Sequence, residues 1–259
     1  MTENKQTPSH SSAVASCAGG ERKSFLITLR DWADALIIAY ILAMFIRTFI
    51  VELFKIPTGS MTPTLVGDVC AEFDYDGNGE DDLVLLKEAG VIHVFFREGG
   101  KFVRDQFIFN PPQYKLVGRH FKNRFDKIVV NKFDYWFKIP NHGDIVVFKV
   151  PPKIFTPDKP VYIKRCIGLP GDVVEIKNGG VYVNGKRLTG EPYDHIYYQN
   201  ECDRHYFTRA TIPQGHIMVL GDNTKSSLDS RAWGFVPLEN LKGRAFFRYK
   251  PLNKISFLN

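Results

Sequence analysis

The sequence contains few of the residues that usually build a metal centre or a disulfide scaffold. Only 4 of its 259 residues are cysteines, no two of them form a C-x-x-C pair, and the motif H-E-x-x-H is absent. Cys17, Cys70, Cys166 and Cys202 are too few and too far apart for a disulfide-held fold, and no Cys/His cluster has zinc-ligand spacing. We therefore expect no metal and no cofactor. A Cys70–Cys202 bridge stays open if the domain lies in an oxidising compartment, although unpaired thiols are favoured.

Dense runs of charge are also missing. The 34 lysines and arginines exceed the 28 aspartates and glutamates by 6, but they are scattered along the chain, so nucleic acid is not an expected partner. A mean hydropathy of −0.18 excludes a protein with many membrane spans. The content of 44% hydrophobic and 14% aromatic residues excludes general disorder.

One long apolar stretch is present, and we expect residues 31–54 to form a transmembrane helix. Its uncharged core from Ala35 to Ile46 has 12 residues, and extension to Val51 gives 17 residues interrupted only by Arg47. As a helix this stretch is about 25 Å long, close to the thickness of a bilayer core. A buried or amphipathic helix is the alternative. The span is favoured because an arginine near one end can extend to the lipid headgroups.

The charges that flank this stretch predict its orientation. Arg22, Lys23 and Arg30 precede it, whereas only Lys55 follows it closely. The positive-inside rule then places the N-terminus in the cytoplasm and the rest of the chain outside. We expect a flexible cytoplasmic tail over residues 1–30, in keeping with the serine, threonine and glycine near its start.

The rest of the chain has the pattern of a mainly β protein. Short β-branched and aromatic runs such as DIVVFKV and VYIKRCIG are separated by glycine, proline, asparagine and aspartate. This pattern predicts an antiparallel, partly closed β domain over residues 55–250, followed by a C-terminal tail over 251–259.

A nucleophile and a base can be suggested from two segments of this domain. Ser60 lies in PTGSMTPTL, and Lys164 lies in YIKRCIGLPGD, within an apolar strand. A serine needs a base to attack a carbonyl, and no G-x-S-x-G elbow is present. A lysine with its ordinary pKa of about 10.4 is almost never neutral at pH 7, but desolvation to a pKa near 8 makes about a tenth of it available. Taken alone, a turn serine and a surface lysine are the commoner interpretations.

A third segment, GDNTKSSLDSRAWGFVP at residues 221–237, has two interpretations. It is a polar loop with Asx turns, or it is a fixed hydrogen-bond network that carries a second hydroxyl and orients an amine base.

Together with GDIVVF at residues 143–148, these segments resemble, in the same order, the conserved boxes of type I signal peptidase. The apolar stretch directly before Ser60 resembles the anchor of that family. The resemblance implies a membrane-bound serine endopeptidase that cleaves N-terminal signal peptides from exported preproteins. It also implies a single-pass protein of the cytoplasmic (inner) membrane with its catalytic domain outside. The expected partners are preprotein signal peptides, the lipid bilayer and the secretion translocon.

The resemblance also assigns roles to individual residues. Ser60 corresponds to the nucleophile, Lys164 to the general base, and Ser227 to the hydroxyl that orients the lysine. The oxyanion would be held by the Ser60 N–H and by Thr58, which keeps the hydroxyl of a serine found in some members. The expected structural support comes from Asp222, Asp229 and Arg231. The expected substrate cleft is lined by Phe54, Ile56, Pro57, Met61, Leu65, Tyr162 and Ile163.

The chain departs from the family most clearly between Ser60 and Lys164, which are 104 positions apart. Residues 69–126 therefore look like an insertion. It contains Asp74 to Asp82, where acidic residues resemble a calcium-binding loop, but Leu85 replaces the glutamate expected at position 12. An acidic hairpin turn is the favoured interpretation. An alternative function is a catalytically silent, membrane-anchored β module that binds a secretory partner through this insertion.

Overall fold

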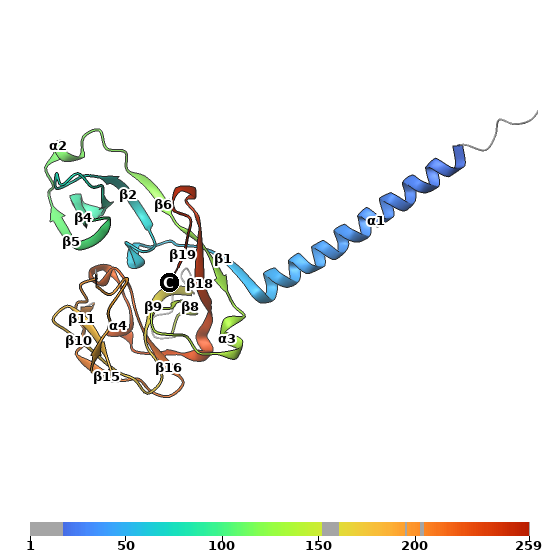
Figure 1. The fold of residues 1–259 in the computed structure, drawn as a ribbon. Coiled ribbons are helices and arrows are strands. Elements are labelled where there is room, and N and C mark those ends of the chain that lie inside the picture. The colour runs from blue at the N-terminus through green and yellow to red at the C-terminus, as the bar shows by residue number, and fades with distance from the viewer. Residues whose placement is uncertain (1–17, 152–160, 195, 203–204, 259) are drawn as a thin grey trace, which may run out of the picture. The chain divides into compact units, whose positions relative to one another are not determined.

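The computed structural model describes residues 18–151, 161–194, 196–202 and 205–258. The chain divides into two compact units, residues 1–48 and 49–259. The first unit holds a long helix, and the second holds the strands (Figure 1).

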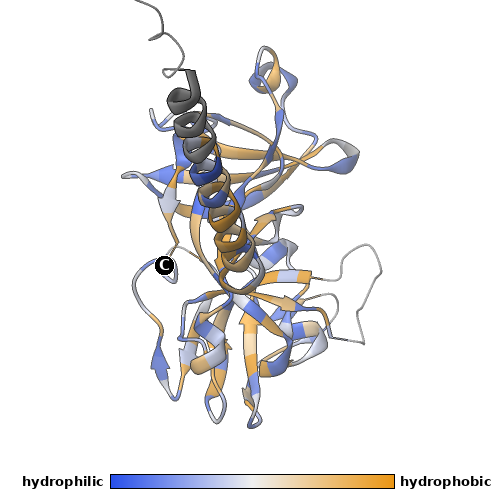
Figure 2. Cartoon of the chain, turned by 90° about the vertical axis from the view of Figure 1, so that its right-hand side faces the viewer, coloured by the Kyte–Doolittle hydropathy of each residue, from blue (hydrophilic) through white to orange (hydrophobic). Residues whose placement is uncertain are grey.

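The helical unit is built around α1 (Ala18–Phe45), which continues into a short π-helical turn, η1 (Ile46–Ile50). The segment Thr28–Ile50 is 23 residues long and apolar enough to cross a membrane, and none of its most apolar window is buried. Figure 2 shows the apolar colouring of this part of α1. A helix in which apolar side chains face outward all round suits lipid better than water.

Two boundaries of this region differ from the sequence prediction. Helix α1 begins at Ala18, so residues 18–30 are helical where a flexible tail was expected. The helix ends before residue 54, because Val51–Lys55 forms strand β1 and pairs with β7 (Lys127–Asn131). Residues 51–54 include a β-branched valine and a phenylalanine, and both residue types favour strands. Pairing with β7 therefore outweighs the helical periodicity of the sequence. Residues 1–17 of the expected tail lie outside the described residues.

The second unit confirms the predicted mainly β, antiparallel fold. Its largest sheet has eight strands and curls into a half-barrel, with the order β1-β7-β18-β8-β9-β16-β17 and β19 paired to β18. Its other strands are β8 (Ile145–Lys149), β9 (Val161–Gly168), β16 (His216–Leu220), β17 (Val236–Pro237), β18 (Leu241–Lys250) and β19 (Ser256–Phe257). Separate apolar clusters pack on this sheet, one around Met61 and Ile145 and another around Phe148 and Val219.

The segment 69–126, expected to be an insertion, forms most of a separate five-stranded sheet. The order is β5-β4-β3-β2-β6. The strands are β2 (Gly67–Phe73), β3 (Asp82–Leu86), β4 (Val91–Glu98), β5 (Lys101–Phe109) and β6 (Lys122–Phe125), with the short helix α2 (Gln113–Leu116) between β5 and β6. Its core is aromatic and includes Phe73, Tyr75 and Phe96. We call this second sheet, from β2 to β6, the insertion sheet.

Smaller elements complete the unit. A four-stranded sheet has the order β12-β11-β10-β15, and β13 pairs with β14. These strands are β10 (Val173–Lys177), β11 (Gly180–Val183), β12 (Lys186–Arg187), β13 (Glu201–Cys202), β14 (His205–Tyr206) and β15 (Arg209–Thr211). The helices are α3 (Asp134–Phe137), α4 (Ser230–Trp233) and the 3-10 turns η2 (Gly59–Met61), η3 (Glu88–Gly90), η5 (Thr224–Ser226), η6 (Leu238–Asn240) and η7 (Leu252–Lys254).

The C-terminal segment expected as a tail is packed against the β domain. Strand β19 pairs with β18, and Leu258 is buried in the cluster that contains Met61. Cys70 and Cys166 are buried free thiols, as the favoured prediction has it. Cys202 is buried and its thiol donates to the carbonyl of Ser227 at 3.0 Å, while Cys17 lies outside the described residues.

Candidate active site

The candidate nucleophile lies in a tight turn between two sheets. Ser60 is the middle residue of η2, which follows β1 of the half-barrel and precedes β2 of the insertion sheet. Thr58 is extended at the start of this turn, so the chain reverses direction at the serine. Ser60 is 9% exposed. The turn therefore holds its hydroxyl at the edge of the core, still within reach of a bound chain.

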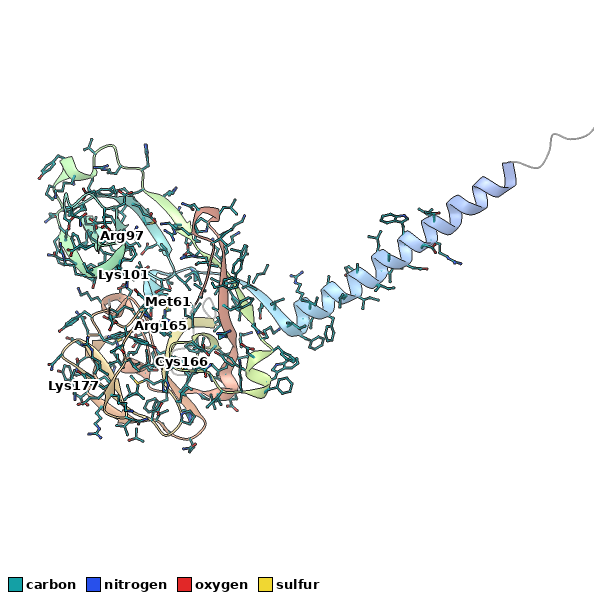
Figure 3. All side chains as sticks on the ribbon, viewed as in Figure 1. Met61, Arg97, Lys101, Arg165, Cys166 and Lys177 are labelled. Carbon is teal, nitrogen blue, oxygen red and sulfur yellow. The ribbon has the colours of Figure 1, made fainter. Side chains whose placement is uncertain are left out.

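The candidate base reaches this hydroxyl from strand β9. The Nζ atom of Lys164 lies 2.6 Å from Ser60 Oγ, within the 2.6–3.2 Å expected of a nucleophile and its base. Figure 3 labels the neighbours of the two residues, Met61 and Arg165, which come from η2 and β9. The curl of the sheet thus brings together two residues that are 104 positions apart in the sequence.

Burial gives Lys164 the lowered pKa that a general base needs. Lys164 is 3% exposed, and desolvation lowers its pKa to about 8, although the charges of Asp229 and Asp222 oppose the shift. With that pKa, about a tenth of the amine is neutral at pH 7. A neutral amine can accept the proton of a serine, which an ordinary surface lysine rarely does.

Asn223 fixes the backbone of the nucleophile turn. Its N–H donates to the carbonyl of Ser60 at 3.1 Å, and its side-chain Nδ2 donates to the carbonyl of Gly59 at 2.9 Å. Asn223 is 1% exposed. Asn223 lies within the third segment, GDNTKSSLDSRAWGFVP, but no role was predicted for it. A buried amide needs hydrogen-bond partners, but the sequence does not indicate which carbonyls accept the hydrogen bonds of Asn223.

A buried ion pair stands beside the lysine. Arg165 is 1% exposed and donates from Nε and Nη2 to the two oxygens of Asp222 at 2.9 and 2.7 Å, and from Nη1 to the carbonyl of Gly143 at 2.7 Å. Asp222 was expected as structural support, whereas Arg165 was not singled out. The signal for it was an arginine inside an apolar strand, because a charge in that place needs a partner.

A second buried ion pair closes the C-terminal loop. Arg231 donates to both oxygens of Asp229 at 2.8 Å, from Nε and Nη2. Its Nη2 also reaches the carbonyl of Thr224 at 3.0 Å, and Asp229 accepts from the N–H of Gly221 at 3.1 Å. The pair therefore ties the two ends of the segment 221–231 together, while the supporting role of Asp229 and Arg231 in catalysis stays a prediction.

Ser227 differs from its expected contact. Its hydroxyl is buried yet has no hydrogen-bond partner among the described residues, so the structure does not contain the expected bond to Lys164. Ser227 packs against Gly221, where a Cβ would lie 2.1 Å from Ser227 Oγ and 2.6 Å from the carbonyl of Ser60. Gly221 thus allows Ser227 and the nucleophile turn to approach each other. A hydroxyl buried without a partner costs about 1–3 kcal/mol.

Thr58 holds the position expected for an oxyanion donor beside the nucleophile. Its Oγ1 lies 3.4 Å from Ser60 Oγ, and the side chain is half-buried. The hydroxyl can rotate toward an oxygen that develops on a substrate bound at Ser60.

The residues expected to line the substrate cleft divide into two groups. Met61 and Leu65 are fully buried and Ile56 is nearly so, and all three pack in one core cluster with Ile163. These side chains are part of the core, and their role in lining a substrate cleft stays a prediction. Phe54 and Tyr162 are half-buried, and Pro57 is exposed.

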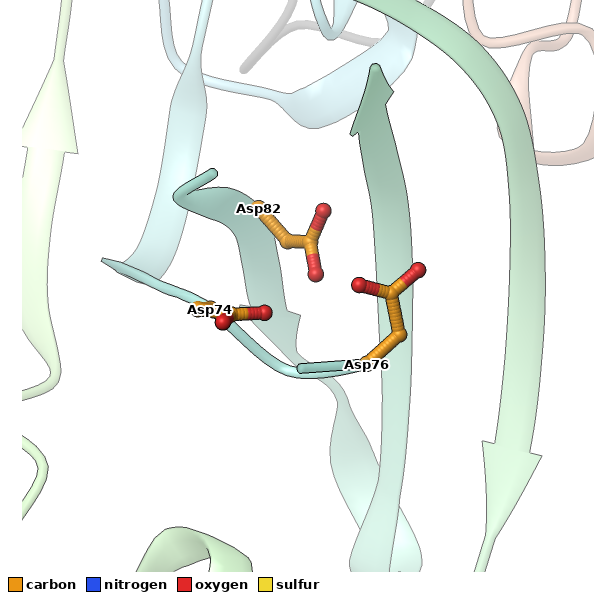
Figure 4. Close-up of side chains that lie close together, drawn as sticks. All are labelled: Asp74, Asp76 and Asp82. Atoms are coloured by element: carbon orange, nitrogen blue, oxygen red, sulfur yellow. The ribbon is translucent and has the colours of Figure 1, made fainter. Parts of the chain in front are cut away.

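Three aspartates of the insertion sheet, Asp74, Asp76 and Asp82, lie close together at its acidic loop (Figure 4). Carboxylate oxygens of Asp74, Asp76 and Asp82 lie within 4.8 Å of one another, a grouping that could hold a metal ion. Asp74 accepts N–H bonds from the loop, and the one from Gly79 contributes most to lowering its pKa. Leu85, at the twelfth position of a calcium-loop pattern, is buried in β3. The acidic turn is therefore stabilised by hydrogen bonds from its own backbone N–H groups to the carboxylate of Asp74.

Comparison with known proteins matches the chain to one family. The model of the family described as signal peptidase, peptidase S26, covers residues 29–87 and 121–250. It includes the nucleophile turn, β9 and the C-terminal loop. The unmatched segment, 88–120, lies inside the expected insertion of 69–126 and contains β4 and β5, so β2 and β3 lie within the matched part.

Individual relatives give the same result. The chain is 38% identical over 134 residues to a probable signal peptidase I-2 of Synechocystis sp., across 51% of this chain and 59% of that protein. It is 40% identical over 139 residues to a signal peptidase I of Bacillus caldolyticus, across 50% of this chain and 72% of the relative. A crystal structure of a signal peptidase I from Enterococcus faecalis is 30% identical, with a TM-score of 0.31 over 41% of this chain and 97% of that one. The chain belongs to the signal peptidase, peptidase S26 family.

Proposed function

We propose that this chain is a membrane-anchored serine endopeptidase that removes N-terminal signal peptides from exported preproteins. The observation that carries the proposal is the 2.6 Å contact between Ser60 Oγ and the Nζ of a buried lysine, Lys164. Membership of the signal peptidase family supports the same substrate class.

The proposed reaction begins with proton transfer inside this pair. Neutral Lys164 accepts the proton of Ser60, and Ser60 Oγ bonds to the scissile carbonyl carbon. The carbonyl oxygen becomes an oxyanion, which the Ser60 N–H and the Thr58 hydroxyl stabilise. The tetrahedral intermediate collapses, the C–N bond breaks, and protonated Lys164 gives its proton to the leaving amine. The signal peptide remains as an ester of Ser60.

The second half regenerates the enzyme. A water molecule gives a proton to Lys164 and attacks the ester carbonyl, and the same oxyanion donors act again. Collapse returns the proton to Ser60 and releases the signal peptide with a new carboxylate. We propose that Ser227, whose buried hydroxyl lacks a partner, orients the Lys164 amine when that amine moves between these roles.

The strand edges of the half-barrel suit an extended substrate. Among the described strands, β1 pairs only with β7, and β16 pairs with the last part of β9, from Arg165 onward. The segment Val161–Lys164 therefore pairs with β8 along one edge, and no described strand covers its other edge. We propose that the end of the signal peptide adds to these edges near Phe54 and Tyr162, with small side chains at −1 and −3.

The proposed placement follows from the anchor. The segment Thr28–Ile50 crosses the cytoplasmic membrane, the N-terminus lies in the cytoplasm and the β domain lies outside. The lipid bilayer and the secretion translocon are then partners of the intact protein.

Cleavage of a preprotein whose signal peptide ends in Ala-x-Ala tests this proposal. The full chain in detergent should cut it once, whereas Ser60→Ala and Lys164→Met should lose at least about 10³-fold in kcat, as expected for members of a dyad. Lys177→Met is the matched control, because Lys177 is an exposed lysine on β10 and lies away from Met61, the neighbour of Ser60 (Figure 3). Wild-type activity in either dyad variant would exclude this dyad. A folded wild-type chain without turnover would favour the silent β module.

A further inference from the structure

The insertion sheet contacts the C-terminal loop of the candidate site through one ion pair. Lys225 belongs to η5, two residues before Ser227. Its Nζ lies 3.0 Å from Oδ2 of Asp105 and donates to the main-chain carbonyl of the same residue at 2.7 Å. Asp105 lies on β5, inside the segment that the family model does not match. The two residues are 120 positions apart.

A buried histidine holds Asp105 from the other side. The Nε2 of His93, on β4, lies 2.7 Å from the same Oδ2 of Asp105. His93 is fully buried, its ring stacks on Phe107 at 4.0 Å and packs on Phe95 at 4.4 Å, and its Nδ1 has no partner. The neutral ring therefore keeps its proton on Nε2 and donates it to the carboxylate. Burial lowers the pKa of His93, consistent with a neutral ring.

These contacts give Asp105 a defined position and charge. Burial alone would raise its pKa, but the hydrogen bonds from His93 and Lys225 lower it. The side chains of Asp105 and Lys225 are 18% and 23% exposed. An ion pair that is mostly withdrawn from water and fixed by a third group is stronger than an exposed pair, which is worth little.

The loop held by this pair carries the groups next to the nucleophile. Immediately before Lys225 stand Thr224 and Asn223, and Asn223 binds the carbonyls of Gly59 and Ser60. Phe95 and Asp105 of the insertion sheet and Asn223 and Thr224 of the loop line one small cavity. The insertion sheet thus lies against η5 and contacts it through Asp105 and Lys225, and movement of η5 would displace the nucleophile turn.

We propose that Asp105 is a positioning residue that acts through Lys225 to hold η5, and with it Asn223 and Ser227, in the geometry needed for cleavage. Part of the insertion then serves as a brace for the candidate site. This inference rests on the proposed peptidase function, because the geometry that is held is that of the Ser60–Lys164 pair.

The test is a double-mutant cycle on the full chain in detergent, with the Ala-x-Ala preprotein as substrate. Asp105→Ala and Lys225→Met should each lower kcat by about 10- to 100-fold, because a displacement of about 1 Å near the chemistry has effects of that size. KM should change less than about threefold. The double variant should lose no more than either single variant, because both break one contact.

A matched control comes from the same strand. Lys101, at the start of β5, also pairs with a residue outside the insertion sheet, Glu191, at 3.0 Å, but both side chains are about 60% exposed and neither residue belongs to η5. Lys101→Met should keep wild-type kcat. Asp105→Asn, which keeps the shape and an acceptor oxygen, should retain more activity than Asp105→Ala. If Asp105→Ala does not fold, Asp105→Asn takes its place in the test.

The outcomes separate this inference from the proposed function. Active Ser60→Ala or Lys164→Met variants would refute the peptidase dyad itself. Inactive dyad variants together with Asp105→Ala and Lys225→Met of wild-type kcat would overturn only the brace. Additive losses in the double variant, or an equal loss in Lys101→Met, would also overturn it, because each shows that the contact does not act specifically through η5.

Discussion

At the scale of single residues, the chemistry depends on the charge state of one amine. Burial lowers the pKa of Lys164 to about 8, and only the neutral amine can take a proton from Ser60. We expect kcat/KM to rise with pH and to reach half of its maximum near pH 8, where half of the free enzyme holds a neutral lysine. A pH–rate profile of the full chain measures this. A profile that is flat from pH 6 to 9 would contradict the assignment of Lys164 as the base.

The same shift predicts how the lysine affects stability. The folded-state pKa of about 8 lies below the ordinary value of 10.5, so the unfolded chain binds more protons between these limits, and stability from this group increases as pH rises through that window. Below pH 8 the buried amine costs about 3 kcal/mol. Lys164→Met should therefore be more stable than wild type at pH 6, and the difference should shrink by pH 10. Urea unfolding at both pH values checks this, with Lys177→Met as the unaffected control.

At the scale of structural elements, the site is formed by turns that are in close contact with one another. At Gly221, just after β16, an added Cβ would lie 2.1 Å from Ser227 Oγ and 2.6 Å from the Ser60 carbonyl. Gly221→Ala must therefore push η5 or the nucleophile turn aside, and we expect a loss of about 100-fold in kcat. At Gly59, the nearest atom to an added Cβ is the side-chain Oδ2 of Asp68 at 3.0 Å, which can move. Gly59→Ala should lose less activity, and equal losses would contradict this explanation.

The same elements show what the sequence could and could not reveal. Ser60 and Lys164 were predicted as a pair because the segments around them resemble, in the same order, the boxes of type I signal peptidase. The contact of Asn223 with Gly59, 164 positions away, is visible only after the sheet has curled. Strand β1 was assigned to the helix, because its residues suit both structures and only pairing with β7 decides between them. Contacts between residues that are far apart in the sequence therefore decide these two features, which the local sequence pattern does not predict.

At the scale of the whole molecule, the second unit carries an aromatic patch around α3. There Phe133, Trp136, Phe137 and Ile139 are between 45% and 76% exposed. Trp136 packs edge-on against Phe49, a residue of the same unit that belongs to the end of the apolar segment Thr28–Ile50. Exposed aromatic side chains near the end of an apolar segment of this length are typical of a membrane interface. We therefore expect this patch to rest in the headgroup region.

Tryptophan quenching in lipid vesicles tests the patch directly, because the chain contains 3 tryptophans. In the full chain with Trp32→Phe and Trp233→Phe, the fluorescence of Trp136 should be quenched by brominated acyl chains. The matched variant with Trp32→Phe and Trp136→Phe leaves Trp233, which packs on the cluster around Phe148 inside the β domain. Its fluorescence should be unchanged by the same lipids. Equal quenching of both residues, or of neither, would contradict the expected position of α3 in the headgroup region.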